Sequence, residues 1–154
     1  MPFTPPATYS SAANDAYLAT FYIGTVASPD SYSIVHEIKS FAPDLGTVPE
    51  VPTTHLLSPF ATEEFSPGLI KPGKVDVTAN FLFDSTQSGL TPLMQGQLIF
   101  FWKIVAPVQR KTATYTATGT GFLVNYKPGP FENNKAIDLM YSIQITGVYT
   151  ETLG

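Results

Sequence analysis

The sequence contains no cysteine in its 154 residues. A disulfide framework, a thiolate metal site and a cysteine nucleophile are therefore excluded, and packing must stabilise the fold. Charged residues are also few: they make up 13% of the chain, with 12 acidic and 8 basic side chains and a net charge of -4. Only Arg110 and Lys111 are adjacent basic residues. Nucleic-acid binding needs clusters that neutralise phosphates, so the sequence argues against that class.

Motifs for catalysis are missing as well. The two histidines, His36 and His55, do not stand in the HxH, HExxH or HxxxH spacing of a zinc site. The sequence has no GxSxG, P-loop or GxGxxG motif. Adjacent carboxylates at Glu63 and Glu64 point in different directions, so we interpret them as solvated loop charges. We therefore expect a protein that is not an enzyme and that uses no cofactor or metal.

Long hydrophobic runs are absent too. The longest, residues 98–106, is interrupted by Lys103 and is far shorter than the ~20 residues that a membrane helix needs. The first residues show neither the basic nor the apolar segment of a secretory signal. The sequence therefore predicts no membrane anchor.

What the sequence does contain is the alternating pattern of β-strands. We expect strands at residues 16–25, 32–41, 75–84, 98–106, 112–126 and 135–149. Leu90, Leu93 and Met94 recur at helical spacing and predict one short helix within residues 85–96. The fold class is therefore mainly β: an antiparallel β-sandwich or partial barrel with one short α-helix and a long loop. We expect residues 1–15 to form a flexible N-terminal arm and residues 16–154 a single β domain.

The clearest of these strands is residues 75–84. Its odd-numbered residues, from Val75 to Phe83, are apolar and predict a buried face, opposite a polar face. Threonines at alternate positions of residues 112–120 predict a second sheet surface that is polar without charge. The polar side chains opposite the apolar face of the first strand are those of Asp76, Thr78, Asn80 and Asp84.

A proline-rich segment, residues 43–67, interrupts the strands. It has little regular pattern, and a loop of this length in a compact domain is usually functional or disordered. Its apolar residues favour a loop that docks on another surface. Two Pro-Gly pairs follow closely and predict stiff turns that aim the next strand. The residues that carry this interpretation are Leu56, Leu57, Phe60, Phe65, Pro67, Gly68, Pro72 and Gly73.

Three parts of the chain together resemble the tail tube proteins of long non-contractile-tailed bacteriophages, the lambda-like tail tube family. They are the loop, Pro-Gly corner and strand of residues 53–83, the short helix followed by the strand at 98–106, and the ending at 116–150. The ending shows a strand, a spacer, a long final strand and a Thr-Gly close. The resemblance covers about residues 16–150.

The resemblance implies a structural role. Six copies would form a ring, and stacked rings would form a hollow tube around a tape-measure protein, through which DNA later passes. Tail terminator and tail-tip proteins would be further partners, and the tube would be assembled in the host bacterial cytoplasm and reside in the virion. The assembly loop of such a tube would contain Leu56, Leu57, Phe60, Glu63, Glu64, Phe65, Pro67, Gly68, Pro72 and Gly73. For the lumen we expect the polar face with Asp76, Thr78, Asn80 and Asp84, and the threonine-rich surface is the second candidate. The alternative is that Asp76 and Asp84 face the outer solvent.

Two other functions remain open. A related tube-forming bacterial secretion protein would share the β architecture. A carbohydrate-binding β-sandwich would need aromatic side chains such as Trp102 to be exposed as a stacking platform, although core packing is the simpler role for them.

Overall fold

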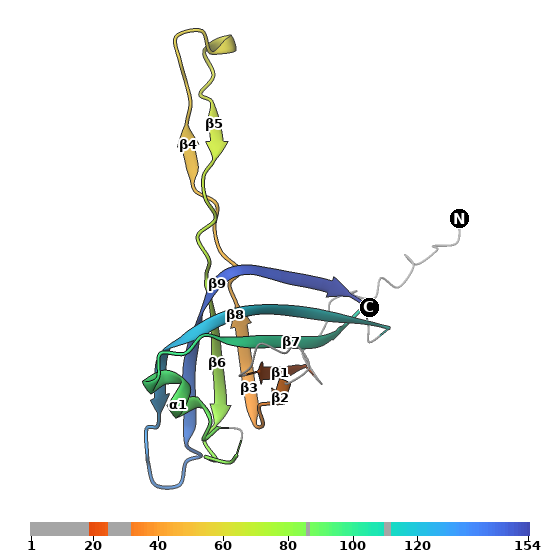
Figure 1. Ribbon diagram of the computed structural model, residues 1–154, viewed down its shortest axis with the longest axis vertical. Coiled ribbons are helices and arrows are strands. Elements are labelled where there is room, and N and C mark those ends of the chain that lie inside the picture. The colour runs from red at the N-terminus through yellow and green to blue at the C-terminus, as the bar shows by residue number, and fades with distance from the viewer. Residues whose placement is uncertain (1–18, 25–31, 86, 110–111) are drawn as a thin grey trace, which may run out of the picture.

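The computed structural model describes residues 19–24, 32–85, 87–109 and 112–154, so the N-terminal arm expected for residues 1–15 lies outside the described residues. Figure 1 shows a curled sheet from which one long hairpin projects. The elements are β1 (Thr20–Gly24), β2 (Tyr32–Ile34), β3 (Ile38–Pro43), β4 (Glu50–Pro52), η1 (Pro59–Ala61), β5 (Phe65–Pro67), β6 (Lys74–Asn80), α1 (Leu90–Gln95), β7 (Phe100–Val108), β8 (Ala113–Pro128) and β9 (Asp138–Leu153). In the described part, no helix has the length and apolar character needed to cross a membrane.

Seven strands form one antiparallel sheet in the order β2-β1-β7-β8-β9-β6-β3. The central strands β8 and β9 are each 16 residues long. Each long strand changes neighbours along its length: β8 pairs with β7 through residues 113–121, and β9 pairs with β6 through residues 138–144. The prediction of a mainly β, antiparallel fold is confirmed.

The sheet curls until its two ends meet. The rings of Phe21 in β1 and Phe41 in β3 lie 6.2 Å apart between centroids, and the Val35 amide donates to the Phe21 carbonyl at 2.9 Å. Residues 35–37 cross from one edge strand to the other, so the single strand expected at residues 32–41 is in fact two, β2 and β3. The curl gives the partial barrel that the sequence predicts.

The core fills the inside of this curl. Trp102 is fully buried, its Nε1–H donates to the Thr120 carbonyl at 3.3 Å, and its ring lies against Gly119, where a Cβ would come within 2.7 Å of Cζ2. Residue 119 must therefore be glycine for the indole to pack so closely. The other large buried side chains include those of Phe21, Phe100, Leu90, Ile104, Leu139, Tyr141, Ile143 and Ile145.

The predicted short helix is confirmed as α1. Leu90 and Leu93 are its buried residues, and they join the core where α1 packs against β8. The apolar run that follows behaves differently from the prediction, because Leu98 and Ile99 precede β7 and are exposed.

β6 is shorter than the strand predicted at residues 75–84. Val75, Val77 and Ala79 are buried as expected, but the strand ends at Asn80. Phe83 has a φ of 52°, outside the extended range of a bulky strand residue, and its side chain is exposed. The placement of Phe83 in the core was therefore wrong.

Buried Gln87 explains why the chain leaves the sheet here. Its Oε1 accepts the amides of Leu82 and Phe83, both at 2.9 Å, and its Nε2 donates to the Asn80 carbonyl at 2.7 Å. These three bonds tie residues 80–83 to Gln87 in a compact turn, because a buried amide side chain is stable only when its polar atoms are paired. Asp84 therefore lies in a turn and not on the strand.

The segment between β3 and β6 is a two-stranded hairpin and not an irregular loop. β3 and β6 pair with each other as part of the seven-stranded sheet. Between them the chain projects outward through residues 44–73, which we call the long hairpin (Figure 1). Its two halves are linked at Thr47 and Lys71, through the β4–β5 pairing, and at Thr53 and Glu64. Its prolines hid this pairing from the sequence, yet they are tolerated because both sides of a two-stranded ribbon are free edges.

Candidate assembly surfaces

The far end of the long hairpin is an exposed apolar cluster. The relative exposures of Leu56, Leu57 and Phe60 are 104%, 87% and 98%, and we call these three residues the hairpin tip. Side chains so exposed contact almost nothing in their own subunit. Every residue predicted for the assembly loop lies on the long hairpin, so the structure brings that set together.

Polar side chains hold the turn that carries the tip. The Ser58 hydroxyl donates to Glu64 Oε2 at 2.7 Å and accepts the His55 amide at 3.0 Å. The ring of His55 accepts the Leu57 amide at 3.1 Å, and its Nε2 lies 3.5 Å from Glu64 Oε2. Glu64 thus organises the turn, which the sequence interpretation of a solvated charge did not anticipate, whereas Glu63 is exposed.

The two Pro-Gly pairs do not form the turns predicted for them. Both pairs lie in the second half of the long hairpin, where its two halves approach each other closely. A Cβ on Gly68 would come within 2.9 Å of Pro49 Cγ, and a Cβ on Gly73 within 2.1 Å of the Asp44 carbonyl oxygen. Glycine is therefore required at both positions by cross-strand distance.

Gln144 of β9 fixes the root of the long hairpin. Its Nε2 donates to the carbonyls of Pro72 and Gly73 at 3.2 and 3.0 Å, and the Ile145 amide also donates to the Gly73 carbonyl at 3.1 Å. These bonds determine the direction in which the hairpin leaves the sheet. No sequence pattern predicts this role, because Gln144 alternates along β9 like any polar strand residue.

The two candidate lumen surfaces lie on one face of the same sheet. Asp76 is opposite Ser142, whose hydroxyl donates to it at 2.6 Å, and Thr120 is opposite Thr146. Residues 142, 144 and 146 of β9 point to one side, since side chains alternate along a strand. This shared surface, the polar face, includes Asp76, Thr78, Asn80, Thr116, Thr118, Thr120, Thr146, Thr150 and Thr152.

Asp84 is separate from the polar face. It lies beyond the end of β6, where its Oδ1 accepts the Gln87 amide at 3.0 Å and its Oδ2 is 3.3 Å from His36 Nδ1. These contacts close the turn after β6. The prediction that Asp84 shares a strand face with Asp76 was wrong.

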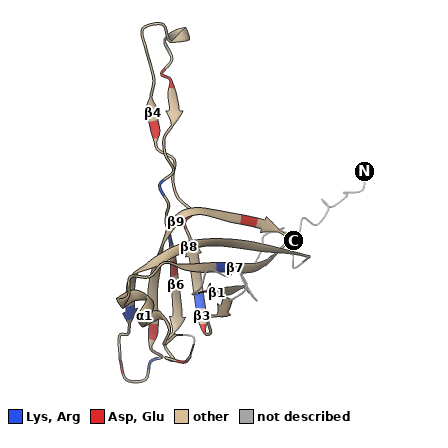
Figure 2. Ribbon diagram, viewed as in Figure 1, with Lys and Arg blue, Asp and Glu red and all other residues tan. Residues whose placement is uncertain are grey.

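The negative charge of the chain is concentrated on the long hairpin. Residues 44–73 contain four acidic residues and only Lys71 as a base, giving -3 of the net charge of -4. On the polar face, Lys103 Nζ lies 4.7 and 4.6 Å from the ring centroids of Tyr22 and Tyr32, and most of β8 carries no charge (Figure 2). The sheet surface is therefore close to neutral.

The second half of β9 has a strand neighbour on one side only, among the described residues. Residues 145, 146 and 150–153 pair with β8, with a register shift at residues 147–149, while β6 pairs with β9 no further than Gln144. Thr114 and Gly154 exchange both backbone hydrogen bonds. Because hydrogen-bonded and non-hydrogen-bonded pairs alternate in antiparallel sheets, the amides of Glu151 and Leu153 point away from β8. We call residues 146–153 the open edge.

Tyr115 and Glu151 brace this edge. The Tyr115 hydroxyl donates to Glu151 Oε1 at 2.7 Å. Burial, followed by this hydrogen bond, raises the pKa of Tyr115 to about 12. The hydroxyl therefore stays protonated, and able to donate, to a higher pH than that of an ordinary tyrosine.

The described part of the chain gives little support for a metal site or a carbohydrate-binding site. It contains no group of three His, Cys, Asp or Glu side chains placed to hold a metal ion. Trp102 is 0% exposed, so it cannot serve as the stacking platform that a carbohydrate-binding module needs. The structure thus contradicts the main requirement of that alternative.

A scan of protein-family models and a search of curated proteins find no match. Solved structures do match. The tail of an empty gene transfer agent particle, with C6 symmetry, has a TM-score of 0.73 at 10% identity, over 91% of this chain and 99% of that chain. The SPP1 tail tube has a TM-score of 0.57 at 14% identity, over 88% of this chain and 76% of that chain.

A third similar structure comes from a different kind of machine. The sheath-tube complex of an extracellular contractile injection system has a TM-score of 0.64 at 10% identity, covering 90% of this chain and 91% of that chain. The fold is therefore not confined to the long non-contractile tails that the sequence resembles. The chain has the fold of tail tube proteins from phage-like tails and contractile injection systems.

Proposed function

We propose that this chain is the repeating subunit of a phage tail tube, in which hexameric rings stack into a hollow tube. The fold shared with a tail of C6 symmetry supports this role. The tube would surround a tape-measure protein and conduct DNA into the host, and terminator and tail-tip proteins would close its ends. Assembly would take place in the host bacterial cytoplasm, and the finished tube would belong to the virion.

The open edge of β9 carries the proposal. An exposed edge strand presents unpaired amides and carbonyls, which pair readily with another strand. This edge spans residues 146–153 and shows no proline or bulky charge cluster that would block pairing. Its pairing with a strand of the next subunit would close a ring and remove the edge.

The size of such a ring suits a DNA channel. If each of six subunits contributes four strands, the resulting 24 strands at a spacing of ~4.8 Å enclose a circle roughly 37 Å across without tilt and ~50 Å across at 45° tilt. A closed sheet of that diameter is too wide for its own side chains to fill.

The polar face would line the channel. The strands next to the open edge are β9, β8 and β7. On the polar face, β8 and the end of β9 present mainly threonines, whereas β7 presents Phe101, Lys103 and Val105. DNA carries one charge per ~1.7 Å of its length, so a lining rich in lysine would hold it back. The threonine hydroxyls carry no charge, and the ammonium group of Lys103 lies against two tyrosine rings. Such a lining would let DNA pass. Asp76, Thr78 and Asn80 extend the same lining along β6.

The experiment that tests this proposal replaces Glu151 at the open edge. Glu151→Pro removes an amide that points away from β8, and Glu151→Ala is the matched control that loses only the Tyr115 contact. We expect both variants to keep the wild-type circular dichroism spectrum. In negative-stain micrographs of concentrated protein, wild type and Glu151→Ala should give hollow tubes and Glu151→Pro none. Normal tubes from Glu151→Pro would contradict the role of the edge.

The tube of a bacterial injection machine is the second candidate, because the contractile injection system shares the fold. Such a protein would form rings spontaneously after purification and would carry an effector. A phage tube subunit is expected to stay monomeric at low concentration until an initiator recruits it. Sedimentation of the dilute protein separates the two cases.

A further inference from the structure

The molecule exposes a second apolar cluster at the end opposite the hairpin tip. Leu82, Phe83 and Phe131 are 56%, 54% and 66% exposed, and they surround the half-buried Phe81. We call these four residues the aromatic patch. In Figure 1 the hairpin tip is at the top of the long axis, while the turn after β6 and the β8–β9 connection lie at the bottom.

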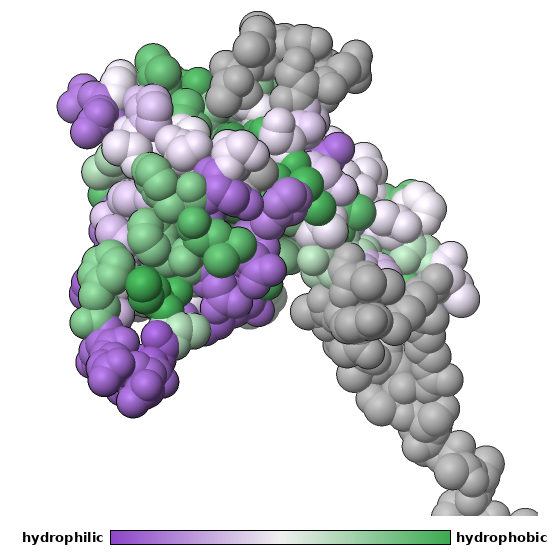
Figure 3. Space-filling view, turned by 90° about the horizontal axis from the view of Figure 1, so that it is seen from below, coloured by the Kyte–Doolittle hydropathy of each residue, from purple (hydrophilic) through white to green (hydrophobic). Residues whose placement is uncertain are grey.

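The aromatic patch is one connected surface. The ring of Phe81 lies 5.9 Å from that of Phe83 and 6.0 Å from that of Phe131, the latter in an edge-to-face arrangement. The Phe81 amide also donates to the Ile137 carbonyl at 2.7 Å, which ties the two segments together. Figure 3, seen from this end, shows hydrophobic residues gathered beside strongly hydrophilic ones. A patch with a polar rim marks an interaction surface.

Both apolar clusters are held in place by specific polar contacts. Phe60 at the tip and Phe83 in the patch have φ angles of 60° and 52°, a conformation that is costly for a bulky residue. Glu64 and its partners hold the first turn, and Gln87 holds the second. Strain of this kind persists where surrounding structure enforces it, and it concentrates at functional sites. At both ends the result is an exposed phenylalanine on a supported turn.

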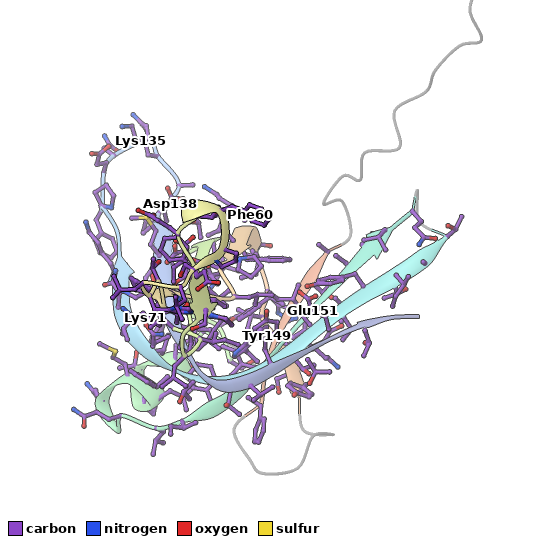
Figure 4. The ribbon with its side chains drawn as sticks, turned by 90° about the horizontal axis from the view of Figure 1, so that it is seen from above. Phe60, Lys71, Lys135, Asp138, Tyr149 and Glu151 are labelled. Carbon is purple, nitrogen blue, oxygen red and sulfur yellow. The ribbon has the colours of Figure 1, made fainter. Side chains whose placement is uncertain are left out.

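The two clusters are aligned along the molecule. Figure 4 looks down the long axis from the hairpin side, and in this projection Phe60 lies close to Asp138. Asp138 follows Ile137, the residue bonded to Phe81. A second copy displaced mainly along this axis would therefore bring its tip toward the aromatic patch of the first.

We propose that the hairpin tip of one copy docks on the aromatic patch of a second copy in the adjacent ring. This inference rests on the proposed function, and it names the surface that receives the tip. The contact is heterologous, since the two surfaces differ, and head-to-tail contacts of this kind generate open-ended polymers. It therefore gives stacking a direction.

The area of the contact fits a subunit that assembles cooperatively, as part of a ring. Three exposed side chains of this kind offer on the order of 500 Å² of apolar surface. With an equal area from the patch, one docking buries roughly 1,000 Å², at the lower limit for a specific interface. A single tip would hold weakly, whereas the tips of a whole ring act together.

Two other apolar hollows in the described part compete for the tip. One lies on the flank between α1 and β8, at Met94, Ile99 and Phe122, and the other at the hairpin root, at Ile70 and Val148. Neither lies at the end of the long axis opposite the tip. They provide the control positions for the test.

The test uses cysteine cross-linking, which is clean because the chain has no cysteine of its own. A Phe60→Cys variant is mixed in turn with Phe131→Cys, Ile99→Cys and Val148→Cys, each pair is assembled into tubes, and disulfides are formed with mild oxidant. We expect the Phe60–Phe131 pair to yield at least ten times more dimer than either control pair. All four positions are exposed, and circular dichroism verifies that each variant folds.

The outcomes separate the two proposals. Tubes in which Phe60→Cys links mainly to Ile99→Cys or Val148→Cys would overturn this inference and leave the proposed function standing. Tubes in which Phe60→Cys forms no dimer above the control yields would also overturn it. If wild-type protein forms neither rings nor tubes when concentrated and crowded, both proposals fail.

Discussion

The long hairpin and the curled sheet differ in the burial of their apolar side chains and in their net charge. In the described chain every fully buried apolar residue belongs to the sheet, its connections or α1, and none to residues 44–73. The hairpin has the opposite character, with its largest apolar side chains in solvent and three of the four net negative charges. An isolated two-stranded ribbon is marginally stable in water. The sheet therefore provides the stability, and the hairpin is free to serve contacts with other copies.

The largest expected difference between the two regions concerns stability. Trp102→Ala removes the largest buried side chain and should cost about 3 to 5 kcal/mol of unfolding free energy. Phe60→Ala removes a fully exposed ring and should change stability by less than about 0.5 kcal/mol. Denaturant unfolding of both variants measures the contrast. Similar losses from the two variants would contradict the division of roles.

A smaller contrast lies within the long hairpin itself. Gly73→Val forces a side chain against the Asp44 carbonyl at the root, where Ile145 and Gln144 bind, and should cost about 1 to 3 kcal/mol. Gly68→Val disturbs only the free ribbon and should change the unfolding free energy by less than about 0.5 kcal/mol. Thermal unfolding monitors stability and electron microscopy monitors assembly.

Both glycine variants should fail to form tubes. A distortion of the hairpin at either position changes the direction of its tip, even when the sheet stays folded. Gly154→Ala serves as the control, because a Cβ at Gly154 would meet no atom within 4 Å. Tubes from Gly68→Val and Gly73→Val that match wild type would show that the hairpin's geometry is irrelevant to assembly.

The strands of the sheet were predictable because their alternation reflects burial. Val75, Val77 and Ala79 alternate with polar residues and are buried as the pattern indicates. Period-two patterning reports which face is covered, but it does not report where a strand ends. Phe83 continues the apolar alternation, and only the buried Gln87, several residues later, removes it from the sheet.

The assembly surfaces were predictable in part. The apolar residues of the hairpin tip are conspicuous in the sequence, because a polar linker would not contain them. The aromatic patch could not be found in this way, since Phe131 lies in a connection and meets Phe81 only through the tertiary fold. The Pro-Gly pairs were misread because a glycine required by cross-strand distance looks the same in the sequence as a glycine required by a turn.

The most direct test shortens the long hairpin. A variant in which residues 47–71 are replaced by Asn-Gly keeps β3, β6 and the whole core, and a two-residue turn of this type suits an antiparallel pair. The account predicts a folded monomer whose melting temperature is close to that of wild type and which forms no tubes in negative-stain micrographs under conditions where wild type does. An unfolded variant, or one that still forms tubes with the wild-type axial repeat, would contradict it.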